Sequence, residues 1–541
     1  MVKKIVASAV VALAFAALPL LVAADAGRVN STTIPHVLRF ASAEDIQGLN
    51  PDLNTQAVLG WLQQMTMAHL FKYDHDNHIV PELATVIPSF KNGGISRDGM
   101  TITLHLRRGV KWSDGAPFDA SDVIFSCNVI NNPANNVPGR DGFDRITKMD
   151  EPDPYTVVVH LREPYGEIVP TLFASNSGSV VLPKHILGSL PDINTAPYNS
   201  LPIGIGPFRY TAWKRGDSVE LEANPYYWRG RPKLDRVIFK ILPDRNTVLA
   251  QLQTGELDLW YPFGGAFLAR VQAIPSVSVL RQPAYGYNEI GLNLKNPALA
   301  DVDVRRALRL ATDRRTMISK VFHGVGIAQD VAAPLVDSSV PKDIPFVEYD
   351  PAKANALLDH DGWARGPDGI RAKNGVRMSF TIATSTGTPD VDTLIELVRS
   401  WWQGIGVELT VQHYESSMLF APKSDGGILN NGKFDVAFFG WQVATPIDPF
   451  NLYDCKQVPP TGQNFMYYCD PKVDALFADM HRTYDESRFD RDLSGILHIL
   501  ASDVPIIVNN GRENLFAYNK DLKNFHPNDV SVFDDMMNVD I

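Results

Sequence analysis

The sequence predicts an α/β protein built from two or three closely packed domains. Its 541 residues exceed the usual length of one domain. The first half interleaves strand-like and helical segments, and the second half alternates helices and strands in the order that favours a mostly parallel sheet. No long flexible linker or internal repeat separates these parts, so we expect the chain to cross between domains several times.

The first half contains two clear strand patterns and one helix pattern. Residues 101–106 alternate between polar and apolar side chains, which is the period of a half-buried strand. Turn residues follow at 111–115, and Asp119 or Ser121 can then cap a helix. After a turn at Asp153, residues 157–161 alternate again. Each pattern predicts one element of a mixed α/β region.

The second half reads as helices and strands in alternation. Residues 304–311 place apolar side chains on one helical face and arginines on the other. Asp350 and Pro351 supply an N-cap and a first-turn proline for another helix. The apolar stripe within 394–401 predicts a third helix, followed directly by a strand at 407–411. The apolar run 434–439 suits a central strand covered on both faces.

The N-terminus has the features of a secretory leader. Lys3 and Lys4 precede an apolar stretch from 5 to 24, and Ala24-Asp25-Ala26 supplies a small-x-small cleavage pattern. We expect residues 1–26 to be a cleaved signal peptide, although an uncleaved membrane anchor is the alternative. Pro19 and the small residues argue against that anchor, and no cysteine offers a lipid attachment point. The sequence therefore predicts a periplasmic protein whose mature form is not membrane-anchored.

Charge and cysteine content exclude several classes of protein. A net charge of −11 makes nucleic acid an unfavourable partner, because phosphate binding needs a basic surface. Cys127 lies on an apolar helical face and is expected to be a buried free thiol. Cys455 and Cys469 flank a polar loop and can form a disulfide in an oxidising compartment, with two unpaired thiols as the alternative.

Signatures of catalysis are missing from the sequence. It has no Gly-x-Ser-x-Gly elbow, no His-Glu-x-x-His helix and no phosphate-binding Gly-x-x-x-x-Gly-Lys loop completed by Ser or Thr. The segment Asp74–His78 has metal-like composition but is expected to be a solvated turn, so no metal or cofactor is predicted. The carboxylates are scattered, and the sequence leaves open whether two of them face each other as in a glycosidase.

Aromatic residues near turns and strand ends are the better guide to a ligand site. Trp441 follows Gly440 at the end of the predicted buried strand 434–439, and ligands of open α/β sheets lie beyond the carboxyl ends of strands. Tyr285 and Tyr287 lie near another strand, where ordinary packing is the competing interpretation. We expect Trp441 to border a ligand cleft.

Several motifs, in order along the chain, resemble those of the extracytoplasmic solute-binding proteins of family 5, the dipeptide- and oligopeptide-binding type. The longest is residues 106–126, Leu-Arg-Arg-Gly-Val-Lys-Trp-Ser-Asp-Gly-Ala-Pro-Phe-Asp-Ala-Ser-Asp-Val-Ile-Phe-Ser. The others are Gly-Ile-Gly-Pro-Phe at 204–208, Asn-Pro-Tyr-Tyr-Trp-Arg-Gly at 224–230, Gly-Glu-Leu-Asp at 255–258, Val-Arg-Arg-Ala-Leu at 304–308 with Asp313-Arg314, Tyr349-Asp350-Pro351 with Gly362-Trp363, and Cys-Asp-Pro-Lys-Val-Asp at 469–474.

The resemblance implies a class II periplasmic-binding-protein fold, in which two α/β lobes are joined by a hinge of two crossing segments. It further implies an additional domain on lobe I. The expected division is lobe I at 34–73, 200–285 and 505–541, the extra domain at 74–199, and lobe II at 286–504.

The resemblance also implies a function without catalysis. The chain would be a monomeric receptor of an ABC importer that captures a peptide or peptide-like ligand between its lobes and delivers it to the membrane permease. Alternatives are a receptor for a non-peptide solute, such as an oligosaccharide, an opine-like compound or a metal chelate, a secreted hydrolase, and a periplasmic chaperone-like protein.

One position departs from the peptide-binding pattern. Such members carry an aspartate shortly after the tryptophan that matches Trp441, and it pairs with the peptide's α-amino group. Here Ala444 or Thr445 stands at that place, and Asp448 matches a later Asp-Pro of the family. We therefore expect a neutral or acylated ligand, or a peptide whose amine is held elsewhere. The candidate ligand contacts are Asn54, Thr55, Tyr287, Trp441, Thr445 and Asn509.

Overall fold

The computed structural model describes residues 28–541 except 75–77, 141, 176–177, 387–388 and 528–529. The expected signal peptide, residues 1–26, lies outside the described residues, as do three positions of the Asp74–His78 segment. No helix within the described part of the chain combines the length and apolar character needed to cross a membrane.

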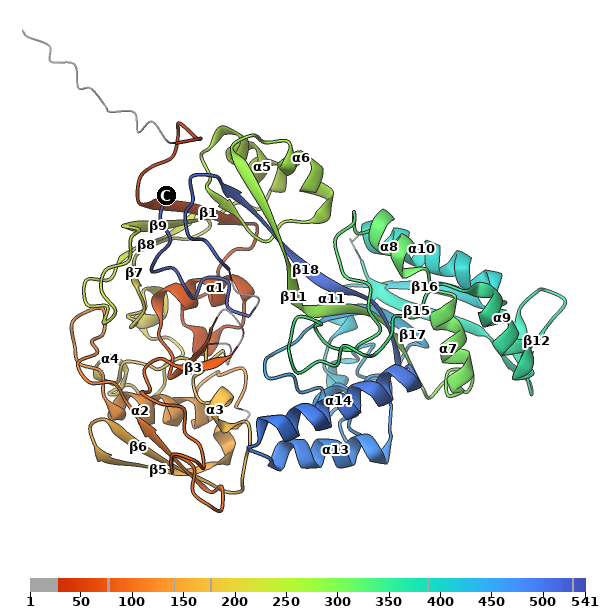
Figure 1. Cartoon of the computed structure of the whole chain (residues 1–541), viewed down its shortest axis with the longest axis horizontal. Coiled ribbons are helices and arrows are strands. Elements are labelled where there is room, and N and C mark those ends of the chain that lie inside the picture. Colours follow the sequence, from red (N-terminus) through yellow and green to blue (C-terminus); the bar gives the residue numbers. More distant parts are fainter. Residues whose placement is uncertain (1–27, 75–77, 141, 176–177, 387–388, 528–529) are drawn as a thin grey trace, which may run out of the picture.

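Two lobes are joined by a pair of long antiparallel strands, β11 (Val277–Leu292) and β18 (Ile506–Asn519), which run from one lobe into the other (Figure 1). Their register shifts between Pro283 and Tyr287 and again between Asn288 and Glu289. These irregularities lie where the strands pass between the lobes, which is where a hinge is needed. The two-lobe α/β fold predicted from the sequence is confirmed.

A ten-stranded sheet runs through both lobes. Its order is β16 (Glu408–Tyr414), β15 (Ser379–Ser385), β17 (Val436–Gln442), β11, β18, β10 (Leu259–Trp260), β1 (Val37–Ser42), β9 (Arg236–Ile241), β8 (Ser218–Ala223) and β7 (Phe208–Lys214). β1 pairs in parallel with β9 and β10, and β15 pairs in parallel with β16 and β17. The remaining pairings in this sheet are antiparallel, so the sheet is mixed in both lobes.

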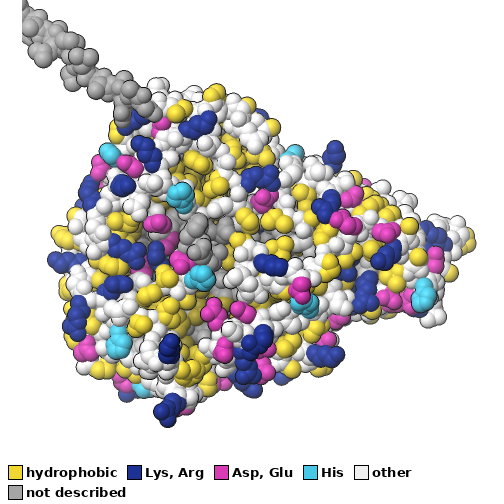
Figure 2. Space-filling model, viewed as in Figure 1, with side chains coloured by type: hydrophobic (Ala, Val, Ile, Leu, Met, Phe, Trp, Pro, Cys, Tyr) yellow, Lys and Arg dark blue, Asp and Glu magenta, His cyan; other side chains and the backbone are white. Residues whose placement is uncertain are grey.

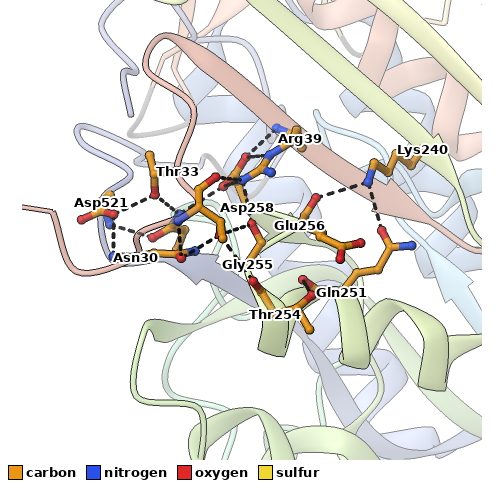
Figure 3. Close-up of polar contacts among 12 residues, drawn as sticks. Asn30, Thr33, Arg39, Lys240, Gln251, Thr254, Gly255, Glu256, Asp258 and Asp521 are labelled. Carbon is orange, nitrogen blue, oxygen red and sulfur yellow. Dashed lines mark hydrogen bonds and ion pairs between the residues drawn. The ribbon is translucent and has the colours of Figure 1, made fainter. Parts of the chain in front are cut away.

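Lobe I contains β10, β1, β9, β8 and β7 of this sheet, together with α1 (Ala57–Thr66), α5 (Arg245–Thr254) and α6 (Leu268–Gln272). A buried polar network ties its segments together (Figure 3). Arg39 of β1 donates to Asp258 from its Nε at 2.7 Å and its Nη2 at 2.8 Å. Asn519, at the end of β18, donates to the same carboxylate at 3.1 Å. Three strands that are distant in sequence are thus joined at one charge pair.

The extra domain has its own sheet, in the order β4 (Thr101–His105), β6 (Thr156–Leu161) and β5 (Ile146–Asp153), packed against α2 (Ala120–Asn131). Asp119, one of the two caps that the sequence allowed, caps α2 and forms a reciprocal capping box with Asp122. Shorter elements are α3 (Ile168–Thr171), α4 (Lys184–Leu187), and the hairpin of β2 (Phe71–Tyr73) with β3 (Ile79–Pro81). Ala68, Leu70, Phe71 and Tyr73 precede the expected boundary at 73/74 but pack into the hydrophobic core of the extra domain. The position of that boundary stays a prediction.

Lobe II covers its half of the sheet with helices on both faces. α7 (Val302–Leu310), α9 (Pro351–His360) and α10 (Pro389–Gly404) pack on one side, and α13 (Pro471–Arg482) and α14 (Glu486–Asp503) contribute to the core on the other. Further elements are α8 (Arg314–Lys320), α11 (Ser416–Leu419), α12 (Phe450–Tyr453), and a small sheet of β12 (Ala364–Arg365), β13 (Arg371–Lys373) and β14 (Val376–Arg377). Short 3₁₀ turns lie at Pro51–Leu53, Phe143–Arg145, Pro197–Ser200, Gly265–Phe267 and Lys423–Asp425.

The cysteines behave as predicted. Cys455 and Cys469 form a disulfide with their Cα atoms 4.5 Å apart, and Cys127 is a buried free thiol on α2. The bridge closes the loop that carries Asn464, Phe465 and Met466 against the lobe II core.

Candidate ligand-binding site

Two adjoining cavities lie between the lobes. The first, of about 330 Å³, is lined by Gly60, Gln63 and Gln64 of α1, Ser175, Gly178, Tyr285 of β11, the segment 442–445 after β17, and Val530. The second, of about 790 Å³, extends toward the extra domain, and both cavities share Gly178, Ala444 and Thr445. Because lobe I, the extra domain and lobe II all contribute walls, a change in lobe orientation would reshape both cavities.

The first cavity is lined by neutral groups. Gln63 and Gln64 of α1 line it opposite Gln442 and Ala444 of lobe II. The Gln63 amide nitrogen is paired with His69 Nε2 at 3.2 Å, and Gln64 Oε1 accepts the Phe533 N–H at 2.8 Å, so each amide keeps its other end for a ligand. The main-chain carbonyl of Thr445 accepts a hydrogen bond from the Tyr73 hydroxyl at 3.1 Å, which links the two sides. No carboxylate belongs to the described lining of this cavity. Amides of this kind can pair with both the N–H and C=O groups of a peptide-like ligand.

The second cavity is acidic at both ends. At its lobe I end, Asp52 follows Pro51 in a 3₁₀ turn and is only 1% exposed. Its Oδ1 accepts the Val180 N–H at 3.3 Å, while its Oδ2 has no hydrogen-bond partner among the described residues. Burial raises the pKa of this carboxyl to about 7, and the Val180 N–H and Ser179 only partly oppose that effect.

The other end of this cavity joins the extra domain to lobe II. Glu167, Asp448 and His481 place their ligand atoms within 4.8 Å of one another, and His481 Nε2 lies 2.8 Å from Asp448 Oδ2. Burial, with the nearby charge of Asp448, raises the pKa of Glu167 to about 7. Burial alone would lower the pKa of His481, but the hydrogen bond to Asp448 together with the charges of Asp448 and Glu167 outweighs burial and raises it. These residue types could also hold a metal ion, which would replace the proton shared by Asp448 and His481.

Direct contacts close the molecule beside this cluster. The Tyr484 hydroxyl, after α13, donates to the Gly99 carbonyl at 2.9 Å and accepts the Tyr165 N–H at 3.0 Å. Phe90 meets the same tyrosine ring edge-on at 5.2 Å. The extra domain therefore touches lobe II on the far side of the second cavity from the hinge.

Only some of the predicted contact residues line the two cavities. Thr55 lines the second cavity and Thr445 lines both. The Asn54 amide donates to the Gly48 carbonyl at 3.1 Å and to Gln56 at 2.9 Å, so it shapes the turn before α1. Their roles in ligand binding stay predictions.

The aromatic pair is less exposed than expected. Tyr287 is 1% exposed within the lobe II core, and Trp441 is half-buried and stacks on Phe465 at 6.0 Å. Asn509, fully buried in the irregular part of β18, has no hydrogen-bond partner for either amide atom among the described residues. None of the three is among the described residues lining the two cavities.

The charged lining of the second cavity was missed by sequence reasoning. Asp52 lies within three residues of the predicted Asn54 and Thr55, yet only its burial against Val180 reveals it. Glu167 and His481 carry no local motif, because 314 positions separate residues 167 and 481 and only the fold brings them together. Tyr285 was considered as an aromatic candidate and does line the first cavity.

A profile described as bacterial extracellular solute-binding proteins, family 5 Middle, matches residues 78–459. The chain belongs to this family. It is similar to the oligopeptide-binding protein AppA of Bacillus subtilis, with 30% identity over 452 residues that cover 82% of this chain and 80% of AppA.

Solved structures of relatives share the fold over nearly the whole length. AppA of Bacillus subtilis in complex with a nonapeptide has a TM-score of 0.73 and 27% identity, covering 93% of this chain and 98% of AppA. NikZ of Campylobacter jejuni in complex with Ni(L-His) has the same TM-score and identity and covers 92% of this chain and 98% of NikZ. The family thus includes proteins solved with quite different ligands.

Proposed function

We propose that this protein is the soluble periplasmic receptor of an ABC importer and that it captures a peptide or peptide-like ligand between its lobes. The observation that carries the proposal is the position of both cavities, which are walled by two lobes joined through β11 and β18. Relatives named as oligopeptide-binding proteins support the peptide class. Closure over the ligand would present a changed surface to the permease without any reaction.

The dimensions and chemistry of the cleft agree with such a ligand. The second cavity, at about 790 Å³, falls within the range of about 300–1,000 Å³ typical of small-molecule sites, and the neutral first cavity adds to it. Gln63, Gln64 and Gln442 suit a ligand main chain. Figure 2 shows Lys and Arg side chains interspersed with Asp and Glu on this face, rather than gathered into the basic patch that a polyanion would require.

The secreted-hydrolase alternative has one observation in its favour. Glu167 and Asp448 lie close together, and a carboxyl with a pKa near 7 beside another carboxylate is an arrangement that glycosidases use. Family membership favours binding over turnover. Incubating the protein with ligand and recovering that ligand unchanged would distinguish the two, because an enzyme would convert it.

The direct test is mass spectrometry of whatever the natively purified protein releases on gentle denaturation, followed by calorimetry with that compound. A released peptide or peptide-like compound that raises the melting temperature on rebinding is expected. Release of a sugar or a metal chelate, with no response to peptides of two to nine residues, would refute the peptide assignment. Intact mass and light scattering of the exported protein test the cleavage after Ala26 and the expected monomer.

A further inference from the structure

Three parts of the molecule deliver acidic groups to the second cavity. Asp52 comes from lobe I, Glu167 from the extra domain, and Asp448 from lobe II. Asp144 adds a fourth carboxylate at the wall. Residues so far apart in the sequence meet only because the lobes approach each other, so their joint environment is a property of the cleft rather than of one turn or helix.

The positive groups facing this cavity are already engaged. Arg145 donates to Glu163 Oε1 at 2.7 Å and lies over the Tyr165 ring at 4.5 Å. His481 is held by Asp448 at 2.8 Å. Among the described residues, no hydrogen bond joins either group to Asp52 or Glu167, although the charges of His481 and Arg145 partly lower the pKa of Glu167.

Asp144 is already paired with Arg162 at 3.5 Å. The other two carboxyls, Asp52 and Glu167, each keep one oxygen without a hydrogen-bond partner among the described residues. Glu167 Oε2 accepts the Tyr165 hydroxyl at 3.3 Å, but its Oε1 has no hydrogen-bond partner among the described residues. Asp52 Oδ2 likewise has no hydrogen-bond partner among the described residues, and its side chain is 1% exposed and lines the cavity. Buried carboxyl oxygens without donors are costly, and a ligand that brought donors and positive charge would remove that cost.

We propose that the second cavity is a subsite for a cationic group of the ligand, an ammonium or guanidinium, with Asp52 at its lobe I end or Glu167 at its lobe II end as the anionic partner. The inference rests on the proposed binding of a peptide-like ligand between the lobes. Lysine and arginine side chains carry such groups, and so does a free α-amine. The neutral first cavity would hold the main chain while the acidic second cavity selects the charge.

The geometry suits an organic cation better than a metal ion. The Asp448–His481 pair is already hydrogen-bonded at 2.8 Å, and a metal bound by both would have to displace the proton between them. An ammonium can leave that pair intact and donate to the unpaired oxygen of Glu167 or of Asp52. That carboxyl would then take the place of the aspartate that Ala444 and Thr445 do not provide after Trp441.

The test uses a defined peptide mixture and conservative variants of the full-length exported protein. The mixture holds N-acetylated peptides of three to nine residues in which one position is either lysine or glutamine, together with the same peptides bearing free amines. Wild-type protein, Asp52→Asn and Glu167→Gln are each equilibrated with it, and retained peptides are quantified by mass spectrometry. Glu396→Gln on α10, an exposed glutamate paired with Arg399, is the matched control.

We expect lysine peptides to be retained at least about tenfold over their glutamine matches by wild type and by Glu396→Gln. The preference should fall to within about threefold in whichever of Asp52→Asn and Glu167→Gln removes the partner of that cation, with the melting temperature verifying that each variant folds. Since both unliganded carboxyls have a pKa near 7, the preference should also be larger at pH 8 than at pH 5.5.

Each other outcome has a distinct meaning. Retention of peptides without a lysine preference, or a preference that survives in both variants, overturns the cationic subsite while leaving the proposed function in place. Zinc binding by the wild type that is lost in Glu167→Gln, without any lysine preference, assigns the cluster to a metal and also overturns it. Retention of no peptide by the wild type overturns the proposed function and the subsite together.

Discussion

Asp258 in lobe I and Glu289 in lobe II are two buried carboxyls with opposite surroundings. Asp258 is fully buried and accepts hydrogen bonds from the Arg39 N–H, Nε and Nη2 and from Asn519 (Figure 3). Glu289, on β11 beside the hinge irregularity, is 1% exposed, and neither of its oxygens has a well-formed hydrogen bond among the described residues. Burial raises the pKa of Glu289 to about 8, which the nearby Trp441 indole lowers only partly.

The difference separates two uses of a buried acid. The hydrogen-bond partners of Asp258 replace the water that its carboxyl has lost, and they join β1, β10 and β18 into one unit. Glu289 is mostly neutral at pH 7 and sits under Trp441 in a core that contains Tyr287 and Phe439. The first arrangement favours a rigid lobe, and the second leaves part of the hinge region sensitive to pH.

The largest expected effect comes from breaking the satisfied pair. Asp258→Asn should lower the free energy of unfolding by about 3–5 kcal/mol, because it leaves the buried Arg39 guanidinium without a charge partner. Chemical denaturation of the exported protein measures this. The double variant Arg39→Met with Asp258→Leu removes both charges and should lose much less. Equal losses in the single and double variants would contradict the account.

The second prediction concerns Glu289 and the sign of its pH dependence. Its pKa is raised from 4.5 to about 8 on folding, so the folded state holds a proton that the unfolded state releases above pH 4.5. Stability from this group is therefore fully present below pH 4.5 and is lost as the pH rises to 8, at about 1.4 kcal/mol for each pH unit.

Glu289→Gln should remove that loss and be more stable than wild type at pH 9, as measured by unfolding at a series of pH values. Glu396→Gln, on an exposed surface, should keep the wild-type slope. An unchanged slope in Glu289→Gln would mean that another group titrates in this window.

The contrast between these two carboxyls also marks how far the sequence alone reaches. Periodicity predicted β4, β6, α2 and β16 because each element buries one face, and local side-chain alternation encodes that face. Family motifs predicted the two lobes. The state of Asp258 or Glu289 depends on partners up to 261 positions away, and such distances leave no local pattern. Asp52, Glu167 and His481 escaped prediction for the same reason.

Removing the disulfide that holds the loop packed near Glu289 should have the next largest effect on the free energy of unfolding. The Cys455–Cys469 bridge holds the loop in which Phe465 stacks on Trp441 and Met466 lies close to Gly291, two residues from Glu289. Replacing both cysteines with serine should cost about 2–3 kcal/mol, since the bridge closes a short loop. Thiol counting under denaturing conditions should find one free thiol in the wild type, and adding reductant should reproduce the loss of stability. A loss in the serine variant that reductant does not reproduce would point to packing of the serines instead.

The smallest effect on stability is expected at Trp441. Substitutions there test the comparison of Asp258 with Glu289 without changing either carboxyl. Trp441→Ala removes a half-buried ring from its stack on Phe465 and its edge contact with Phe439, so a loss of about 1 kcal/mol is expected. The same change admits water toward Glu289. Since burial is what raises the pKa of that carboxyl, the pKa should fall, and the loss of stability between pH 4.5 and 8 should shrink. Trp441→Phe keeps the packing but removes the indole N–H that lowers the pKa of Glu289, so it should steepen the pH dependence instead. Unfolding of the two variants side by side at pH 5 and pH 8 separates these effects.

Calorimetry with the natural ligand should also show weaker binding to Trp441→Ala if the ring borders the cleft. Unaltered affinity, together with a large loss of stability, would place Trp441 in the core of lobe II alone.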